Sequence, residues 1–328
     1  MARLVAAFGS SHSPMLAARA EDWNGGFLSR DRARPHVDLD GNPSNYDTLL
    51  ARAPADAMQR IEPAQLARRH ADITAAIGRL ADDIARSQLD ALIVVGDDQK
   101  ELFDDTNMPA IGIYYGDTIR NAAASSVAGE DWMSVARRRY HEPHGPAEHP
   151  CHSPLARHLI ERLQRDDFDI SVMSGTAEGK YEGHAFSWVH RFCMKHGVIP
   201  IVPIFLNTYY PPNQPTPERC YALGEAMARA VSTLPGDLRI GILASGGLSH
   251  FVVDEAFDRA LLDALQRKDA AFFRNAPLAK LQSGSSEIRN WICMAGALGD
   301  LEPAWIAYAP GYRTPALTGT GLAFASFH

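Results

Sequence analysis

The stretch RLVAAFGSSHSP, residues 3–14, indicates the fold class. Its first part, Leu4–Phe8, is a short apolar run that predicts a buried β-strand. The polar loop that follows carries His12 directly after the end of this strand. Loops at strand ends are where α/β proteins place ligands. The stretch therefore predicts an α/β protein whose first strand leads into a binding loop.

Further short apolar runs predict more strands, and longer patterns with helical spacing lie between them. The predicted strands are Leu4–Phe8, Ala91–Val95, Ala110–Tyr114, Ile170–Met173, Ile199–Ile204 and Ile240–Leu243. The predicted helices are Pro63–Arg86, Pro154–Arg165, Ala185–His196, Pro217–Leu234, Asp254–Phe273 and Ser286–Ala297. Strands that alternate with helices favour a single α/β domain over residues 1–328, with a central mixed sheet flanked by helices.

The segment Asp22–Pro63 has little periodicity and is rich in Asp, Asn, Gly, Pro and Arg. A structureless loop of this length is uncommon in a compact domain and is usually a lid or a binding loop. We therefore expect a lid insertion at 22–63. The proline-rich turn Tyr209–Pro217 predicts a second, rigid loop.

Composition excludes several classes of protein. The chain has 328 residues, 46% of them hydrophobic, which suffices for a large core. A net charge of −7, with Arg137–Arg139 as the one tight basic run, argues against a nucleic-acid partner. The first apolar run is too short for a signal peptide or a membrane span, so no membrane partner is expected. Four scattered cysteines without a CxxC pair favour a reduced, cytoplasmic protein.

Polar side chains that bind metals recur at the ends of the predicted strands. They lie in SSHSP (10–14), in GDDQ (96–99) and in GGLSH (246–250), which Asp254-Glu255 follows. His184 lies in a loop before a helix. Imidazole and carboxylate groups with open positions form the ligand set of non-haem Fe(II) oxygenases. Each motif alone also fits a helix cap or a glycine turn, so the residues by themselves indicate only a metalloenzyme.

A second group of histidines lies in HEPHGPAEHPCH, residues 141–152. His141, His144, His149 and His152 lack regular ligand spacing. Because prolines interrupt the stretch, we expect these side chains to face solvent rather than to bind a metal.

Taken in order, the motifs resemble the class III (LigB-type) extradiol ring-cleavage dioxygenases. SSHSP resembles the family's N-terminal metal-ligand motif, and Glu182-Gly183-His184 its loop with the catalytic base. The stretch 202–224 follows the family's VNxxxxPPP…RCFALG pattern, GGLSH resembles GGMSH, and SGSSE (283–287) resembles a later ESGSEG-like loop. GDDQ resembles the variant of the 3-O-methylgallate dioxygenase branch.

The resemblance implies an Fe(2+) centre. His12 would be one ligand, and Glu255 the carboxylate ligand, although it stands one residue before the family's position. Gln99 occupies the place of the family's other histidine ligand. Asp97, Asp98 and His70 are alternatives for that second ligand.

The resemblance also implies catalytic and substrate-binding groups. His184 would be the acid/base residue, and His152 a second histidine near the site. His250, Ser285 and Ser286 would contact the substrate. Relatives close their site with a small helical subunit or a fused helical piece, which is not recognisable here, so the 22–63 insertion is the expected replacement.

The implied function is extradiol cleavage of a catecholic aromatic acid, such as 3-O-methylgallate, in the catabolism of lignin-derived compounds. The expected partners are the aromatic substrate, dioxygen and a second copy of the chain in a homodimer. Two other functions stay open. One is a Memo-like binding protein of the same fold, and the other is a different metal-dependent enzyme such as a hydrolase.

Overall fold

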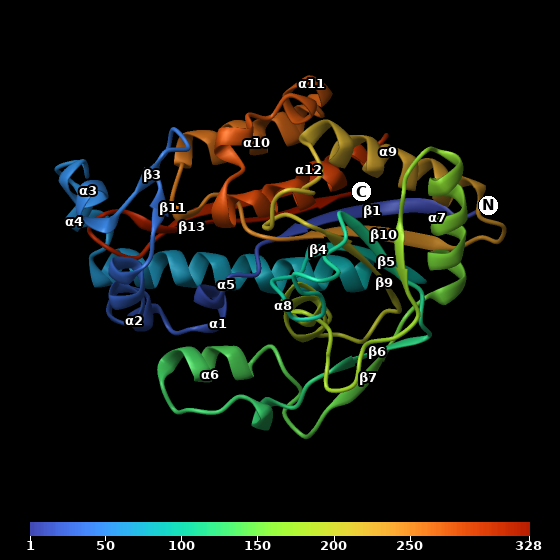
Figure 1. The fold of residues 1–328 in the computed structure, drawn as a ribbon, viewed down its shortest axis with the longest axis horizontal. Helices are drawn as coiled ribbons and strands as arrows, with labels where there is room; N and C mark the ends of the chain where they lie inside the picture. The colour runs from blue at the N-terminus through green and yellow to red at the C-terminus, as the bar shows by residue number, and fades with distance from the viewer.

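The computed structural model describes all residues, 1–328, as layers around one mixed sheet (Figure 1). The order of hydrogen-bonded strands is β11-β13-β1-β10-β4-β9-β5-β8, and β12 pairs with β13. The strands of this sheet are β1 (Arg3–Ser10), β4 (Ala91–Asp97), β5 (Ile111–Tyr114), β8 (Ser171–Met173), β9 (Ile201–Leu206), β10 (Arg239–Ser245), β11 (His250–Val252), β12 (Pro303–Tyr312) and β13 (Thr318–Phe327). The expected α/β fold with a central mixed sheet is confirmed.

Four neighbouring strands, β1, β10, β4 and β9, run parallel. Their residues are almost entirely buried, as expected for strands with helices on both faces. Ser10 at the end of β1 pairs in register with Ser245 at the end of β10. The loops after β1, β10 and β4 therefore leave the sheet at one edge, which brings together the motifs that follow these strands.

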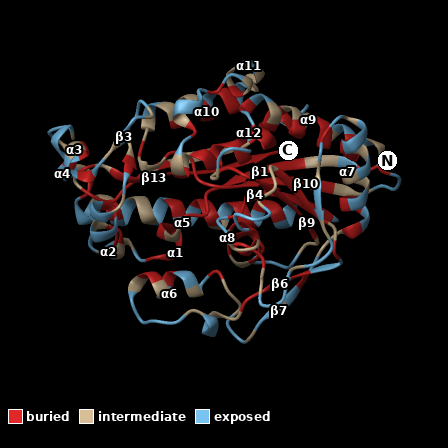
Figure 2. Ribbon diagram, in the orientation of Figure 1, coloured by how far each residue is buried: buried red, intermediate tan, exposed pale blue.

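Helices cover both faces of the sheet, and buried residues form a continuous layer between them (Figure 2). One core contains side chains of α7 (Ser153–Arg165), α9 (Pro217–Thr233), α10 (Glu255–Arg267), α11 (Ala270–Arg274) and α12 (Ile288–Gly296). The opposite core contains side chains of α1 (Pro14–Ala17), α5 (Pro63–Arg86) and α8 (His184–Trp188). In α5, Leu66, Ile73, Ile77, Leu80 and Ile84 recur at helical spacing and are all buried.

All six predicted strands and six predicted helical regions exist, with three differences. The region 185–196 continues from α8 into a π-helical turn, Val189–Cys193. The region 254–273 divides into α10 and α11 at Lys268, which has a left-handed φ of 55°. The region 286–297 begins as a 3-10 turn, Ser283–Glu287, before α12. Another 3-10 turn spans Leu278–Lys280.

The run Ile240–Leu243 is not the last strand. β12 and β13 form an antiparallel pair, and β13 also pairs with β1. β13 reads TGTGLAFASF and is buried along its whole length. Because many of its residues are small, β13 shows little of the β-branched and large apolar pattern that predicts a strand.

The segment 22–63 is folded, which corrects the expectation of a structureless loop. It contains most of α2 (Ala20–Ala33), the short hairpin β2 (His36–Val37) and β3 (Pro43–Ser44), α3 (Tyr46–Ala51) and α4 (Ala57–Arg60). Few apolar side chains mark α2, since its buried residues are Trp23, Phe27 and Asp31. Asp31 forms a bidentate ion pair with Arg313, at 2.7 and 2.8 Å, between side chains that are almost fully buried.

A second excursion lies between β5 and α7, at the bottom of Figure 1. It consists of the hairpin β6 (Thr118–Asn121) and β7 (Ala147–Pro150), the 3-10 turn Ala124–Ser126, and α6 (Trp132–Arg138). The Trp132 ring of α6 lies 4.4 Å from the Phe27 ring of α2, measured between centroids. The two excursions therefore pack against each other. None of the helices combines the length and apolar character needed to cross a membrane.

We predict that Asp31→Ala destabilises the protein by about 3–5 kcal/mol, the usual cost of leaving one partner of a buried ion pair uncompensated. Equilibrium unfolding in urea measures the change. Asp237→Ala is the control, because it removes the exposed Arg3–Asp237 pair, and its midpoint should match that of the parent. Equal midpoints for Asp31→Ala and the parent would contradict an anchoring role for this pair.

Candidate metal centre and substrate cavity

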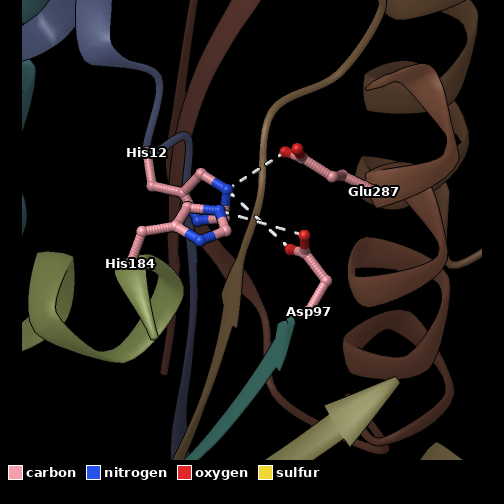
Figure 3. A group of neighbouring side chains, drawn as sticks. All are labelled: His12, Asp97, His184 and Glu287. Atoms are coloured by element: carbon pink, nitrogen blue, oxygen red, sulfur yellow. Dashed lines mark ion pairs between the residues drawn. The ribbon is translucent and has the colours of Figure 1, made fainter. Parts of the chain in front are cut away.

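Four side chains from distant parts of the chain converge at the carboxyl edge of the sheet (Figure 3). They are His12 after β1, Asp97 at the end of β4, His184 at the start of α8 and Glu287 just before α12. Each offers one ligand atom, and these atoms all lie within 4.8 Å of one another. His12, Asp97 and Glu287 are almost fully buried.

The hydrogen bonds of Ser245 orient the imidazole of His12. The Ser245 hydroxyl donates its one proton to the Ala185 carbonyl (2.7 Å). It must therefore accept from Nδ1 of His12, 3.0 Å away, so Nδ1 carries a proton. Nε2 points away from Ser245 and has no hydrogen-bond partner. An imidazole whose Nδ1–H is held in this way can offer Nε2 to a metal ion.

The free nitrogen of His12 faces two carboxylates. Its Nε2 lies 3.2 Å from Oε2 of Glu287 and 3.8 Å from Oδ1 of Asp97. Burial raises the pKa of Asp97, and repulsion from Glu287 raises it further. Burial also acts to raise the pKa of Glu287, but the imidazoles of His250 and His12 outweigh it and lower that pKa. Two buried carboxylates and a free imidazole nitrogen together fit a divalent cation.

His184 is held by Glu101. Its Nδ1 lies 2.8 Å from Oε2 of Glu101, and its backbone N–H donates to Oε1 of the same carboxylate. Burial acts to lower the pKa of His184, but the Glu101 carboxylate outweighs burial and raises this pKa to about 10. Nε2 of His184 points to the cluster, 3.9 Å from Asp97, and has no hydrogen-bond partner.

Two glycines of the sequence motifs make these contacts possible. A Cβ atom on Gly183 would lie 2.6 Å from Oε2 of Glu101, so any other residue would push this carboxylate away from His184. A Cβ atom on Gly247 would lie 2.2 Å from Cε1 of His250. The glycines before both histidines therefore serve close approach.

The predicted substrate-binding residues divide into two groups. His250 reaches the cluster, with Nε2 3.5 Å from Oε2 of Glu287, and lines the adjoining cavity. The Ser285 hydroxyl accepts the backbone N–H of His250 and so supports that residue from behind. The Ser286 hydroxyl is buried without a partner, and neither serine lines the cavity.

Glu255 does not join the cluster, which corrects its predicted place as the carboxylate ligand. Its carboxylate pairs with Arg259 (2.7 Å) and accepts from the Tyr312 hydroxyl (2.9 Å). The carboxylate beside His12 belongs to Glu287, which also accepts the Gly247 backbone N–H (2.8 Å). Glu287 is the last residue of the SGSSE motif (283–287), and the resemblance of that motif to the family's loop is the signal in the sequence that points to it.

His152 lies outside the cavity, which corrects its predicted place near the site. It caps α7, where its Nδ1 accepts the backbone N–H of Leu155 (3.1 Å). The histidine stretch 141–152 also differs from the expected solvent-facing loop. His149 is buried and its ring stacks on His190, with ring centroids 4.1 Å apart, while His190 bonds to Glu182 (2.8 Å).

The positions of Asp97, Asp98, Gln99 and His70 show which of them can serve as the second ligand. The Asp98 carboxylate caps the backbone N–H groups of the turn 101–103, and His70 bonds to the Ala18 carbonyl. Neither joins the cluster. Gln99 lies beside it and donates through Nε2 to Oε1 of Glu287 (3.3 Å). Of the four alternatives, Asp97 at the end of β4 is the one whose carboxylate oxygen faces His12.

A cavity of about 510 Å³ opens beside the cluster. A volume of this size suits a small aromatic molecule. Its walls are formed by side chains of the four-residue cluster, by the GGLSH loop (246–250) and by residues of the two excursions. Lining side chains include His12, Gln99, His184, His250 and Glu287 at the cluster, and also Phe27, Arg34, Met133, Arg137 and Tyr209.

The family model described as the catalytic LigB subunit of aromatic ring-opening dioxygenase matches residues 70–323. The chain belongs to the LigB family. The match includes Asp97, His184 and Glu287, whereas His12 and the 22–63 segment precede it.

This LigB-family chain is also similar to curated proteins. It is 31% identical to a gallate dioxygenase of Pseudomonas putida over 161 residues, which are 45% of this chain and 46% of that protein. It is 30% identical to a 2,3-dihydroxyphenylpropionate/2,3-dihydroxicinnamic acid 1,2-dioxygenase of Comamonas testosteroni over 48% of this chain and 42% of that protein. The matched stretch thus spans less than half the length of either relative.

We predict that His12→Ala and Glu287→Gln abolish stoichiometric Fe(II) binding after anaerobic reconstitution, measured as bound iron per chain. Glu255→Gln is the matched control and should bind iron like the parent. Asp97→Asn should weaken binding more than Gln99→Ala, because only the Asp97 oxygen faces His12. Normal iron content in His12→Ala would contradict the site, and loss in Glu255→Gln would reinstate that residue.

A second prediction concerns the proton on His184. In metal-free protein, its imidazole should titrate well above the ordinary value of about 6.5, and Glu101→Gln should lower this pKa by about 1–3 units, because an opposite charge is removed. Carbon-13 and proton NMR of the histidine Cε1–H groups measures both. The signal of His196, which pairs with Asp82 on the surface, is the internal reference in both spectra. An ordinary pKa in the parent would contradict the coupling.

Proposed function

We propose that this LigB-family protein is an Fe(II)-dependent extradiol dioxygenase that opens the ring of a catecholic aromatic acid. The observation that carries the proposal is the free Nε2 of His12, which faces two buried carboxylates beside His184. 3-O-Methylgallate, from the breakdown of lignin, is the substrate that the GDDQ variant favours. Under this proposal the protein acts in the cytoplasm.

The donor set supports iron as the metal. His12, Glu287 and Asp97 at the end of β4 would hold it, and the Gln99 amide would orient Glu287. Imidazole and carboxylate ligands with open positions suit Fe(II) in oxygenases. Bound Fe(II) would supply Lewis acidity that lowers the pKa of the substrate hydroxyls and a position for dioxygen.

His184 has the geometry of a group that moves a proton at Nε2. Glu101 holds the Nδ1–H, so the opposite nitrogen is free and points to the cluster. Residues that transfer protons need this combination of fixed orientation and an unpaired atom at the reaction site. His184 would exchange a proton with a substrate hydroxyl through Nε2 in the course of the reaction.

The cavity supports an aromatic substrate. His250 lies beside Glu287, while Phe27, Met133 and Phe251 offer apolar walls. Phe27 belongs to α2, so the 22–63 segment covers one side of the cavity and would act as the lid. A lid over the site would limit the access of water during the reaction.

The relatives support the class of substrate. One is named for gallate and the other for 2,3-dihydroxyphenylpropionate. Both compounds combine adjacent ring hydroxyls with a carboxylate. Adjacent hydroxyls suit a metal with open positions, and the carboxylate requires a separate cationic site.

We predict that Fe(II)-loaded protein consumes dioxygen and forms a yellow ring-opened product from 3-O-methylgallate, gallate or protocatechuate. His184→Ala should keep its iron and lose turnover by about 10²–10⁴-fold, the usual range for a general acid/base residue. An oxygen electrode and a visible spectrum measure both.

His196→Ala is the control, because this exposed histidine pairs with Asp82 on the surface. It should turn over like the parent. Iron-loaded parent protein without oxygen uptake on all three acids would refute the proposed activity and favour a metal-binding protein of the same fold. A rate within a few-fold of the parent for His184→Ala would refute its role.

A further inference from the structure

Each acidic side chain in the cavity wall lies beside a basic side chain other than the three arginines considered next. Asp31 pairs with Arg313, Glu101 with His184, and Glu182 with His190. Glu287 faces His12 and His250 and belongs to the predicted metal site.

Three arginines of the same wall have no such partner. Arg30, Arg34 and Arg137 line the cavity, and their side chains make no ion pair and no hydrogen bond within the chain. Arg30 and Arg137 are exposed, whereas Arg34 is partly enclosed. Burial lowers the pKa of the Arg34 guanidinium, and the neighbouring positive charge of Arg313 lowers it further. An anion at Arg34 would relieve both effects.

Phe251 holds the Arg34 guanidinium in place. The central Cζ atom of Arg34 lies 3.3 Å from the centroid of the Phe251 ring. Phe251 itself has a φ of 67°, a left-handed backbone conformation that a bulky residue rarely adopts. It also directly follows His250, whose ring lies at the metal cluster. Phe251 thus links His250, at the predicted metal site, to the aromatic ring on which Arg34 packs.

The helix that carries Arg34 is fixed to the sheet. Arg34 ends α2, and its backbone N–H donates to the Arg30 carbonyl. Three residues earlier, Asp31 forms the buried ion pair with Arg313 and accepts from the Thr318 hydroxyl (2.6 Å) at the start of β13. This pair occupies Arg313, so Arg34 is the least exposed cation of the wall that remains free.

We propose that Arg34 is the specificity-determining residue that binds the carboxylate of the aromatic substrate, with its planar guanidinium stacked on Phe251. Arg30 and Arg137 add positive charge at the rim of the cavity and attract the anion. A guanidinium fork matches a carboxylate with two parallel hydrogen bonds. The inference rests on the proposed function for the identity of the ligand, because the metal site would take the opposite side of the ring.

Binding without turnover tests the inference. The probes are gallate and 3-O-methylgallate, each compared with its neutral amide, which keeps the ring and the hydroxyls. Isothermal titration calorimetry under nitrogen measures the affinities, both in protein without added metal and after Fe(II) loading. The parent should bind each acid about 10- to 100-fold more tightly than its amide, as expected for hydrogen bonds to charged groups.

Arg34→Gln should reduce this preference to within about 3-fold without changing amide binding, while Arg34→Lys, which keeps the charge but not the fork, should lie between the two. Arg32→Gln is the matched control, because Arg32 lies on the same helix but not in the cavity wall, and it should keep the full preference. Circular dichroism checks the fold of each variant.

No preference for the acid in the parent, or an unchanged preference in folded Arg34→Gln, would overturn the inference. A preference that depends on Arg34 in a protein without ring-cleavage activity would support the anion site while the proposed dioxygenase function failed. Loss of affinity for acid and amide alike in Arg34→Gln would show that Arg34 only packs against Phe251, which also overturns it.

Discussion

The predicted metal site depends on the electrostatics of two carboxylates, Asp97 and Glu287, that are buried beside the imidazole of His12. Removing an ion from water costs several kcal/mol unless partners compensate it. Glu287 has such partners in the Gly247 N–H and the Gln99 amide, but Asp97 has only the Asn290 amide at 3.3 Å, and its second oxygen has none. Hydrogen bonds alone therefore leave the cluster undercompensated. A divalent cation among these groups would turn mutual repulsion into shared attraction, which explains why such residues are placed together.

The groups around the cluster orient it more than they contact its centre. Ser245 is the clearest case, because one hydroxyl joins the Ala185 carbonyl near His184 to Nδ1 of His12 and so decides which nitrogen of His12 is free. Glu101 does the same for His184. Asn290 and Trp291 of α12 bind the Ser245 and Gly246 carbonyls, which ties the loop after β10 to the helix that follows Glu287. Since partners of this kind set both the direction and the basicity of ligands, substitutions there should act on metal affinity without touching the metal.

Sequence reasoning located His12, His184 and the loop after β4, because each follows a strand or a glycine turn whose pattern is local. The family resemblance placed the carboxylate at Glu255, one residue before the family's position. Which glutamate reaches His12 depends instead on how the turn 283–287 packs on β11, where a Cβ atom on Gly284 would lie 2.4 Å from the Cβ of His250. Such packing leaves no periodic signal. The same holds for β13, whose small residues fit a crowded position between strands, and for α2, which buries only two large apolar side chains, Trp23 and Phe27, together with the ion-paired Asp31.

Under the two proposals made above, the chemistry and the recognition of the substrate lie on different parts of the chain. Two side chains of the predicted metal site, His12 and Asp97, lie at the ends of parallel strands of a sheet that is buried on both faces, and His184 and Glu287 reach them from the starts of α8 and α12. The unpaired arginines lie on α2 and α6, which belong to the two segments outside the central sheet. Neither segment carries a ligand atom of the predicted metal site. Yet the two parts are not independent, since Asp31 of α2 binds Arg313 and Thr318 at the turn into β13, and β13 pairs with β1, which leads to His12. The separation between the cationic wall and the metal cluster is thereby set through the sheet. A fixed separation selects ligands by the length between their hydroxyls and their anionic group, so small changes in α2 can alter the preferred acid while the chemistry at the sheet edge stays the same.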